Sequence, residues 1–136
     1  MITIRLLPLE SANQRELDNL RNLIHEIFPD ATVTLAGDDI FILAEDEEGE
    51  QLGFAHLSER SGSILLKGIG VRETVRQQGI GTMLMEGVID VTDSDPRPIY
   101  LKVKSLNPAI SFYERHGFVI QKFGGTSHVL TRRRLA

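Results

Sequence analysis

The sequence contains no cysteine. Disulfide bonds, thiolate metal ligands and a cysteine nucleophile are therefore excluded, and no covalent intermediate on cysteine can form. No segment approaches the roughly 20 consecutive apolar residues of a membrane-spanning helix. Residues 1–10 lack the long apolar run and the small-residue cleavage site of a signal peptide. We therefore expect a cytoplasmic protein that does not enter a membrane.

Positive charge is also in short supply. Lysine and arginine number 15 against 19 aspartate and glutamate residues, which gives a net charge of −4. This balance argues against a surface that binds nucleic acid. The one basic run, Arg132 to Arg134, is interpreted as solvated charge, and a nucleic-acid contact by this tail is a weaker hypothesis.

Length and periodicity predict a single α/β domain over residues 1–136. A chain of 136 residues can bury one core but not two. Strands are predicted at 2–6, 40–44, 51–57, 64–71, 99–103, 118–123 and 128–131. Helical spacing of apolar residues predicts helices from Ser11 to Phe28, from about Gln78 to Val91 and from Pro108 to His116.

The stretch GIGVRETVRQQGIGTMLM, residues 68–85, begins as a strand and ends as a helix. A helix N-terminus carries unpaired N–H groups and a partial positive charge, so such a junction can bind phosphate. Gly79 and Gly81 would let the anion approach, and Arg76 to Gln78 supply donors. A plain turn with solvated cations is the alternative. The Rossmann and Walker phosphate loops do not fit, because their third glycine and their glycine–lysine pair are missing.

Two motifs resemble the GCN5-related N-acetyltransferase (GNAT) family. VRETVRQQGIGTMLM, from Val71, is similar to the family's coenzyme A signature, and NPAISFYERHGF, Asn107 to Phe118, is similar to its second signature. The resemblance implies a mixed central sheet of about six or seven strands flanked by about four helices. It also implies transfer of an acetyl group from acetyl-CoA, as co-substrate, directly to a primary amine of a small molecule, peptide or protein.

The resemblance assigns roles to individual residues. Backbone amides of Gln77 to Thr82 would hold the pyrophosphate with help from Arg76. The main chain of Ile69 to Val71 would pair with the pantetheine arm. Asn107 would bond to that arm or to the chain around it. Gly68 and Gly70 would make room for a neighbour or for the cofactor, or mark a bulge. The implied cofactor contacts are Ile69, Gly70, Val71, Arg76, Gln77, Gln78, Gly79, Ile80, Gly81, Thr82 and Asn107.

Tyr113 is the candidate catalytic acid. The departing coenzyme A thiolate needs a proton, and a phenol with a pKa of about 10 in a desolvated pocket can donate one. A tyrosine of the hydrophobic core is the alternative role. Asn107 precedes Tyr113 by six residues where the family more often has seven, which makes the role of Asn107 less secure.

The sequence does not identify the general base. Lys67 stands where some family members carry glutamate, and we expect it to pair with Glu73 or another neighbour. Charged or ionisable side chains beside the expected acceptor cleft are Glu45, Asp46, His56 and Glu59, interpreted first as solvated. A relay of water is an equal alternative. The scattered His25, His56, His116 and His128 show no metal-ligand spacing, so no metal is expected.

The acceptor amine is not identified either. The acidic turn at 45–50 suggests a cationic acceptor and Lys67 an anionic one. Homodimers are common in the family that the chain resembles, although no residue pattern here indicates one. A non-catalytic domain that binds coenzyme A as a sensor or partner module is the alternative function, because the expected carboxylate base is missing.

Overall fold

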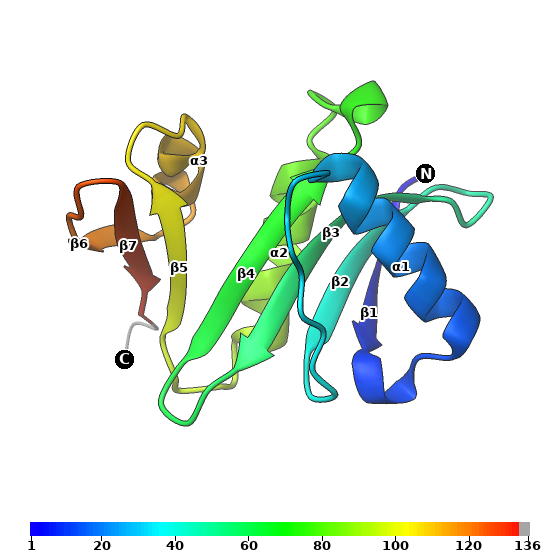
Figure 1. Ribbon diagram of the computed structural model, residues 1–136, viewed down its shortest axis with the longest axis horizontal. Helices are drawn as coiled ribbons and strands as arrows, with labels where there is room; N and C mark the ends of the chain where they lie inside the picture. The colour runs from blue at the N-terminus through cyan, green and yellow to red at the C-terminus, as the bar shows by residue number, and fades with distance from the viewer. Residues whose placement is uncertain (134–136) are drawn as a thin grey trace.

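A computed structural model describes residues 1–133, which form one mixed seven-stranded sheet (Figure 1). The strands lie in the order β1-β2-β3-β4-β5-β7-β6, and only β4 and β5 pair in parallel. Their bounds are Thr3–Pro8 for β1, Ile40–Glu45 for β2, Gln51–Glu59 for β3, Ile64–Val71 for β4, Ile99–Lys104 for β5, Val119–Lys122 for β6 and Ser127–Arg132 for β7. Arg134 of the basic tail lies outside the described residues.

Three α-helices and two 3-10 turns complete the described part of the chain. They are α1 at Gln14–Ile27, α2 at Ile80–Thr92 and α3 at Ala109–Arg115, with the 3-10 turns at Leu9–Ser11 and Glu73–Val75. Figure 1 shows α1 in front of the sheet and α2 behind it. The α/β fold and its mixed sheet agree with the prediction.

Both faces of the sheet are buried, each by its own helix. Leu20, Leu23 and Ile24 of α1 pack with Phe41 and Phe54 on one face. The α2 residues Ile80, Leu84, Met85 and Val88 pack with the sheet on the other face and are at most 1% exposed. The central strands are therefore buried on both faces, and β2 accordingly reads as a nearly continuous apolar run.

Two helix predictions were wrong in detail. The first helix begins at Gln14 and not after Ser11, because Asn13 and Glu16 form a capping box: the Asn13 side chain accepts from the Glu16 amide at 2.9 Å. In α2, Val91 is 38% exposed although it was placed on the buried stripe, and Met85 is buried instead. Near a helix end, the 3.6-residue period predicts which residues face the core only to within about one residue.

Strand β4 contains a bulge beside Gly68, which was one of the alternatives considered for this glycine. His56 of β3 pairs with Gly68 and Leu57 pairs with Leu66, so Lys67 is the extra residue. Leu66 and Ile69 therefore face the same core cluster, although a strictly alternating strand would place residues 66 and 69 on opposite faces. The bulge turns the end of β4 relative to its beginning.

Gly70 makes room for a neighbour. A Cβ atom at this position would lie 2.7 Å from both Ile27 and Phe28 at the end of α1. The end of α1 therefore rests directly on the β4 backbone, and the glycine is required by this close approach.

Strands β4 and β5 separate soon after they begin. Their pairing consists of Ile64 with Ile99 and Leu65 with Tyr100. Beyond Leu65 the two strands diverge, as Figure 1 shows. The β4 residues after Leu65 thus present backbone N–H and C=O groups that β5 does not satisfy, on the edge where Ile69 to Val71 lie.

The packing at Gly53 generates a stability prediction. A Cβ atom there would lie 2.6 Å from the Gly70 carbonyl oxygen, which belongs to a paired strand and cannot rotate away. Gly53→Ala should therefore lower the free energy of unfolding by about 1–3 kcal/mol, measured by urea denaturation. Gly62→Ala is the matched control, because nothing lies within 4 Å of its added methyl group. Equal stability of the two variants would contradict the packing described here.

Candidate active site

A cavity of about 940 Å³ opens where β4 and β5 separate. It is bounded by the end of β4, the turn into α2, the later part of β5 and α3. Of the predicted cofactor residues, all but Gln78 line it, together with Tyr113. Two motifs more than twenty residues apart in sequence thus meet at one cavity.

The turn from β4 into α2 has the backbone of an anion site. Gln77 has φ of 67°, and Gly79, the N-cap residue of α2, has φ of 80°. A left-handed glutamine is strained by of order 1 kcal/mol, and such strain clusters at ligand sites. No side chain caps α2. The first amides of α2, at Ile80 to Thr82, therefore have no helical partner and are free to bind a ligand.

The two glycines of this turn have different constraints. Gly79 is required by its left-handed backbone, which side chains rarely adopt. Gly81 has ordinary φ, and an added Cβ would meet only Phe112 at 3.8 Å. Any requirement for glycine at 81 therefore comes from the approach of a ligand and not from the fold itself.

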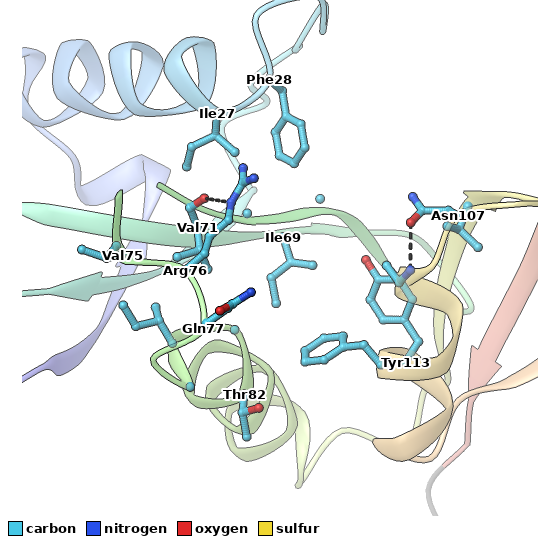
Figure 2. A pocket seen from close by; sticks show the side chains of 18 of the residues that line it. Ile27, Phe28, Ile69, Val71, Val75, Arg76, Gln77, Thr82, Asn107 and Tyr113 are labelled. Atoms are coloured by element: carbon cyan, nitrogen blue, oxygen red, sulfur yellow. Dashed lines mark hydrogen bonds between the residues drawn. The ribbon is translucent and has the colours of Figure 1, made fainter. Parts of the chain in front are cut away.

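Arg76 lies over the end of β4. Its Nε donates to the Val71 carbonyl at 3.1 Å, as Figure 2 shows. In Figure 2 the guanidinium points toward Ile27, on the side away from the turn, and its terminal nitrogens have no protein partner among residues 1–133. Because Arg76 is the residue that enters the turn, this planar cation can pair with two oxygens of a phosphate group at the cavity.

Tyr113 closes the opposite side of the cavity. In Figure 2 its hydroxyl end turns into the space that Ile69 borders from β4. The ring also packs edge-on against Phe112 and Phe118, at centroid distances of 5.6 and 5.9 Å. Tyr113 therefore packs as a core side chain and also lines the cavity, and its role as the acid stays a prediction. Burial raises the pKa of the phenol, so it stays protonated at neutral pH.

Asn107 fixes the start of α3. Its Oδ1 accepts a hydrogen bond from the Ala109 amide at 2.8 Å (Figure 2). The side chain is exposed and lines the cavity. Because α3 carries Tyr113, this bond also helps to hold the phenol at the cavity.

Most of the charged candidates for a base are engaged elsewhere. Glu45 pairs with Arg5 at 2.8 Å, Glu59 pairs with Arg97 at 2.8 Å, and Asp46 accepts from the backbone of its own turn. Lys67 donates to the Thr34 carbonyl at 3.0 Å, so its partner is a backbone group and not the expected Glu73.

His56 differs from these surface groups. It is 2% exposed and lies 2.7 Å from Asp39, which is 1% exposed. The interpretation of His56 as a solvated side chain was therefore wrong. Asp39 was not singled out in the sequence, because an aspartate in the loop sequence AGDD reads as turn chemistry.

A second, smaller cavity of about 260 Å³ adjoins the first. Phe28 and Gly68 line both cavities. The smaller one is otherwise lined by Ile24, Ala31, Thr32, Val33, Phe54, His56 and Lys67. Sequence analysis missed the α1 residues here, because helical spacing marks them only as core. Among residues 1–133, no aspartate or glutamate lines either cavity.

The family model of the acetyltransferase (GNAT) domain matches residues 37–120. The chain belongs to the GNAT family. The match contains β4, the turn and α2, and α3 with Tyr113, so the two motifs of this GNAT domain are both inside it. No curated protein matches the chain in sequence.

Several solved structures share the fold of this GNAT domain. Escherichia coli ElaA superposes with a TM-score of 0.83 at 20% identity, over 98% of this chain and 100% of that one. The ribosomal-protein-S18-alanine N-acetyltransferase of E. coli has a TM-score of 0.80 at 18% identity, over 100% of this chain and 96% of that one. PaiA N-acetyltransferase from Thermoplasma acidophilum, in complex with coenzyme A, has a TM-score of 0.75 at 15% identity, over 98% of this chain and 99% of that one. At these identities the likeness shows the fold.

Two structural features are not found in residues 1–133. No helix in this range has both the length and the apolar character to cross a bilayer. The same range holds no group of three aspartate, glutamate or histidine side chains arranged to bind a metal ion.

The burial of Tyr113 can be measured directly. The protein has two tyrosines, so Tyr100→Phe leaves Tyr113 as the only phenol. Because burial disfavours the phenolate, its absorbance near 295 nm should appear with a midpoint above the ordinary pKa of about 10. Tyr113→Phe supplies the baseline of the other tyrosine. A midpoint at or below pH 10 in the folded protein would contradict this burial.

Proposed function

We propose that this GNAT domain is an acetyl-CoA-dependent N-acetyltransferase that acts on a primary amine of a small molecule, peptide or protein. One observation carries the proposal: the uncapped N-terminus of α2 and the Tyr113 phenol line the same cavity. The first suits a pyrophosphate and the second suits a leaving thiolate.

The cavity residues fit the parts of coenzyme A. The free amides of Ile80 to Thr82 and the guanidinium of Arg76 would hold the pyrophosphate. The unsatisfied edge of β4 at Ile69 to Val71 would bond to the amides of pantetheine as an added strand does. The acyl thioester would then lie farther back along β4, on the side of the cavity that Tyr113 closes.

Transfer is proposed to be direct, from the thioester carbon to the amine, without an acyl-enzyme. A neutral amine attacks that carbon, and the carbon–sulfur bond breaks as the tetrahedral intermediate collapses. Tyr113 gives its phenolic proton to the departing sulfur. The raised pKa of this phenol keeps the proton available at neutral pH. The chain has no cysteine, which excludes an acyl-cysteine intermediate.

The alternative is a sensor or partner module that binds coenzyme A without turnover. It is favoured by the absence of a carboxylate from the residues between 1 and 133 that line the two cavities. Release of free thiol from acetyl-CoA, followed with a panel of primary amines, separates the two functions. Thiol release above the rate without amine supports the transferase. Binding of coenzyme A with no such release supports the sensor.

Removal of the acid should act on chemistry and not on binding. Tyr113→Phe keeps the ring that packs against Phe112 and Phe118 but cannot protonate the thiolate. We expect kcat to fall roughly 10²- to 10⁴-fold, with coenzyme A affinity by calorimetry nearly unchanged. Tyr100→Phe is the matched control. Unchanged turnover in Tyr113→Phe would remove this residue from the mechanism.

Removal of the cation beside the turn should act on binding. Arg76→Ala should weaken coenzyme A binding roughly tenfold at low salt, which corresponds to about 1.4 kcal/mol. The difference from wild type should shrink at 1 M salt, where charges are screened over about 3 Å. Arg15→Ala, on the exposed side of α1, is the control. Equal affinities of all three proteins would mean that Arg76 does not contact the phosphates.

A further inference from the structure

The proposed transfer requires a group that takes a proton from the amine. A lysine-like amine has a pKa near 10 and is almost wholly protonated at neutral pH, and only the neutral form attacks. Neither cavity is lined by aspartate or glutamate in the described residues. His56 is the one neutral base among the side chains that line the smaller cavity.

His56 is held in place by a buried carboxylate. Its Nε2 lies 2.7 Å from Asp39 Oδ2, and its ring stacks on Phe41 at a centroid distance of 4.1 Å. Asp39 is held in turn, because its Oδ2 also accepts from the Ala36 amide at 3.1 Å. Carboxylate, imidazole and aromatic ring together fix the orientation of the histidine and its tautomer.

The second ring nitrogen of His56 is the one left to act. With Nε2 bonded to Asp39, the proton of neutral His56 lies on Nε2 and the lone pair on Nδ1. Nδ1 has no hydrogen-bond partner in residues 1–133. The side-chain atoms in this range that are fully buried and lack a partner are Asp39 Oδ1, Arg72 Nε and Thr131 Oγ1, and Nδ1 is not one of them. Nδ1 therefore keeps access to the space of the cavity.

That cavity leads to the proposed thioester site. Phe28 and Gly68 line both cavities, and His56 pairs with Gly68 across β3 and β4. Ile69, on the coenzyme side, directly follows Gly68. The imidazole therefore lies one strand away from the β4 edge on which the thioester would be held.

We propose that His56, oriented by Asp39, is the general base that accepts the proton of the acceptor amine at Nδ1, directly or through one water in the smaller cavity. This inference rests on the proposed function. It identifies a residue for the role that neither motif supplies.

The surroundings keep His56 in the form that can accept a proton. Burial lowers its pKa and the charge of Lys67 lowers it further, while the bond to Asp39 and the charge of Asp39 raise it. Burial opposes ionisation of Asp39, but the hydrogen bonds from His56 and the Ala36 amide lower its pKa. The other residues of this cavity, from α1, the segment after it and β3, are Ile24, Phe28, Ala31, Thr32, Val33 and Phe54, which carry no charge.

The proton balance closes with His56 and Tyr113 together. An ammonium nitrogen loses two protons when it becomes an amide. His56 takes the first before the carbon–nitrogen bond forms and releases it to water after the product leaves. The second proton leaves the nitrogen as the intermediate collapses and Tyr113 protonates the sulfur. This second proton then returns the Tyr113 phenolate to the phenol. The net products are the amide, the free thiol and one proton in solution.

A structural role for the pair would leave a different signature. A buried histidine that only supports the core changes stability when replaced but does not set a pH dependence. A general base controls the acidic limb of kcat/KM, which rises as the base loses its proton. The test therefore compares how this limb moves in variants that perturb His56 in opposite directions.

The experiment measures kcat/KM against pH with the best acceptor of the amine panel. Wild type is compared with His56→Gln, Asp39→Asn and Lys67→Met, and His25→Gln on α1 is the matched control. Asp39→Asn removes a group that raises the histidine pKa, so the limb should shift to lower pH by about one unit. Lys67→Met removes a group that lowers this pKa, so the limb should shift to higher pH, by up to about one unit. Ionisation of the free amine affects kcat/KM equally in all variants, so it cancels when their acidic limbs are compared.

His56→Gln should lower kcat/KM roughly 10²- to 10⁴-fold, with coenzyme A affinity retained as evidence of folding. Independently of turnover, imidazole nitrogen shifts from NMR should show Nε2 protonated and Nδ1 unprotonated at neutral pH in the coenzyme A complex. A protonated Nδ1 in that spectrum would overturn the proposal.

Normal turnover in His56→Gln, or an acidic limb that stays fixed in Asp39→Asn and Lys67→Met, would also overturn the role of His56. The proposed function would then still stand if Tyr113→Phe is slow. A wild-type protein that binds coenzyme A but releases no thiol with any amine would overturn both proposals.

Discussion

The site depends on the separation of β4 from β5. Two neighbouring strands in the middle of a sheet normally satisfy each other's backbone groups along their whole length. Here the pairing stops after Leu65, and the polar edge of β4 that follows is exposed to a cavity instead of to a strand. A ligand with amide groups can complete this edge, and the break in the sheet is therefore where we propose that the pantetheine arm binds. The turn, the helix N-terminus and the phenol are arranged around it.

The bulge at Lys67 gives the two ends of β4 different tasks. Before it, Ile64 and Leu66 belong to the core against α2. After it, Gly68 and Gly70 face the side on which α1 ends. One strand thereby contributes to the core, to the coenzyme edge and to the wall of the smaller cavity. The extra residue places the Lys67 ammonium at that wall, where it donates to the Thr34 carbonyl and lowers the pKa of His56.

Much of the fold and of the coenzyme side was predictable from local sequence. Strand alternation and helical spacing located every strand and α-helix of the described part. These signals are short-range, since propensity and turn chemistry act over a few residues. A glycine at position 79 was explained by the approach of an anion, whereas its left-handed backbone already requires it. The glycines at 68 and 70 allowed a bulge as one alternative, but an extra residue leaves no mark in an apolar run, so Lys67 was not identified as that residue.

The acceptor side was much less predictable. Asp39 and His56 are 17 residues apart and lie in a loop and a strand, and only the antiparallel pairing of β2 with β3 brings His56 onto Phe41 beside Asp39. A buried hydrogen bond of this kind is a long-range contact that composition does not encode. The end of α1 was missed for the same reason: Phe28 looks like core in sequence, but it lines both cavities.

The contact between Gly70 and the end of α1 constrains how such a protein can change. Phe28 rests on the same strand whose edge is offered to coenzyme A, and it forms the partition between the two cavities. A larger residue at position 70 would push this partition and distort the edge in a single step. On the proposed function, changes of acceptor preference are therefore more accessible through the segment from Ala31 to Val33, which borders the smaller cavity but not the larger one, than through the wall that these two cavities share.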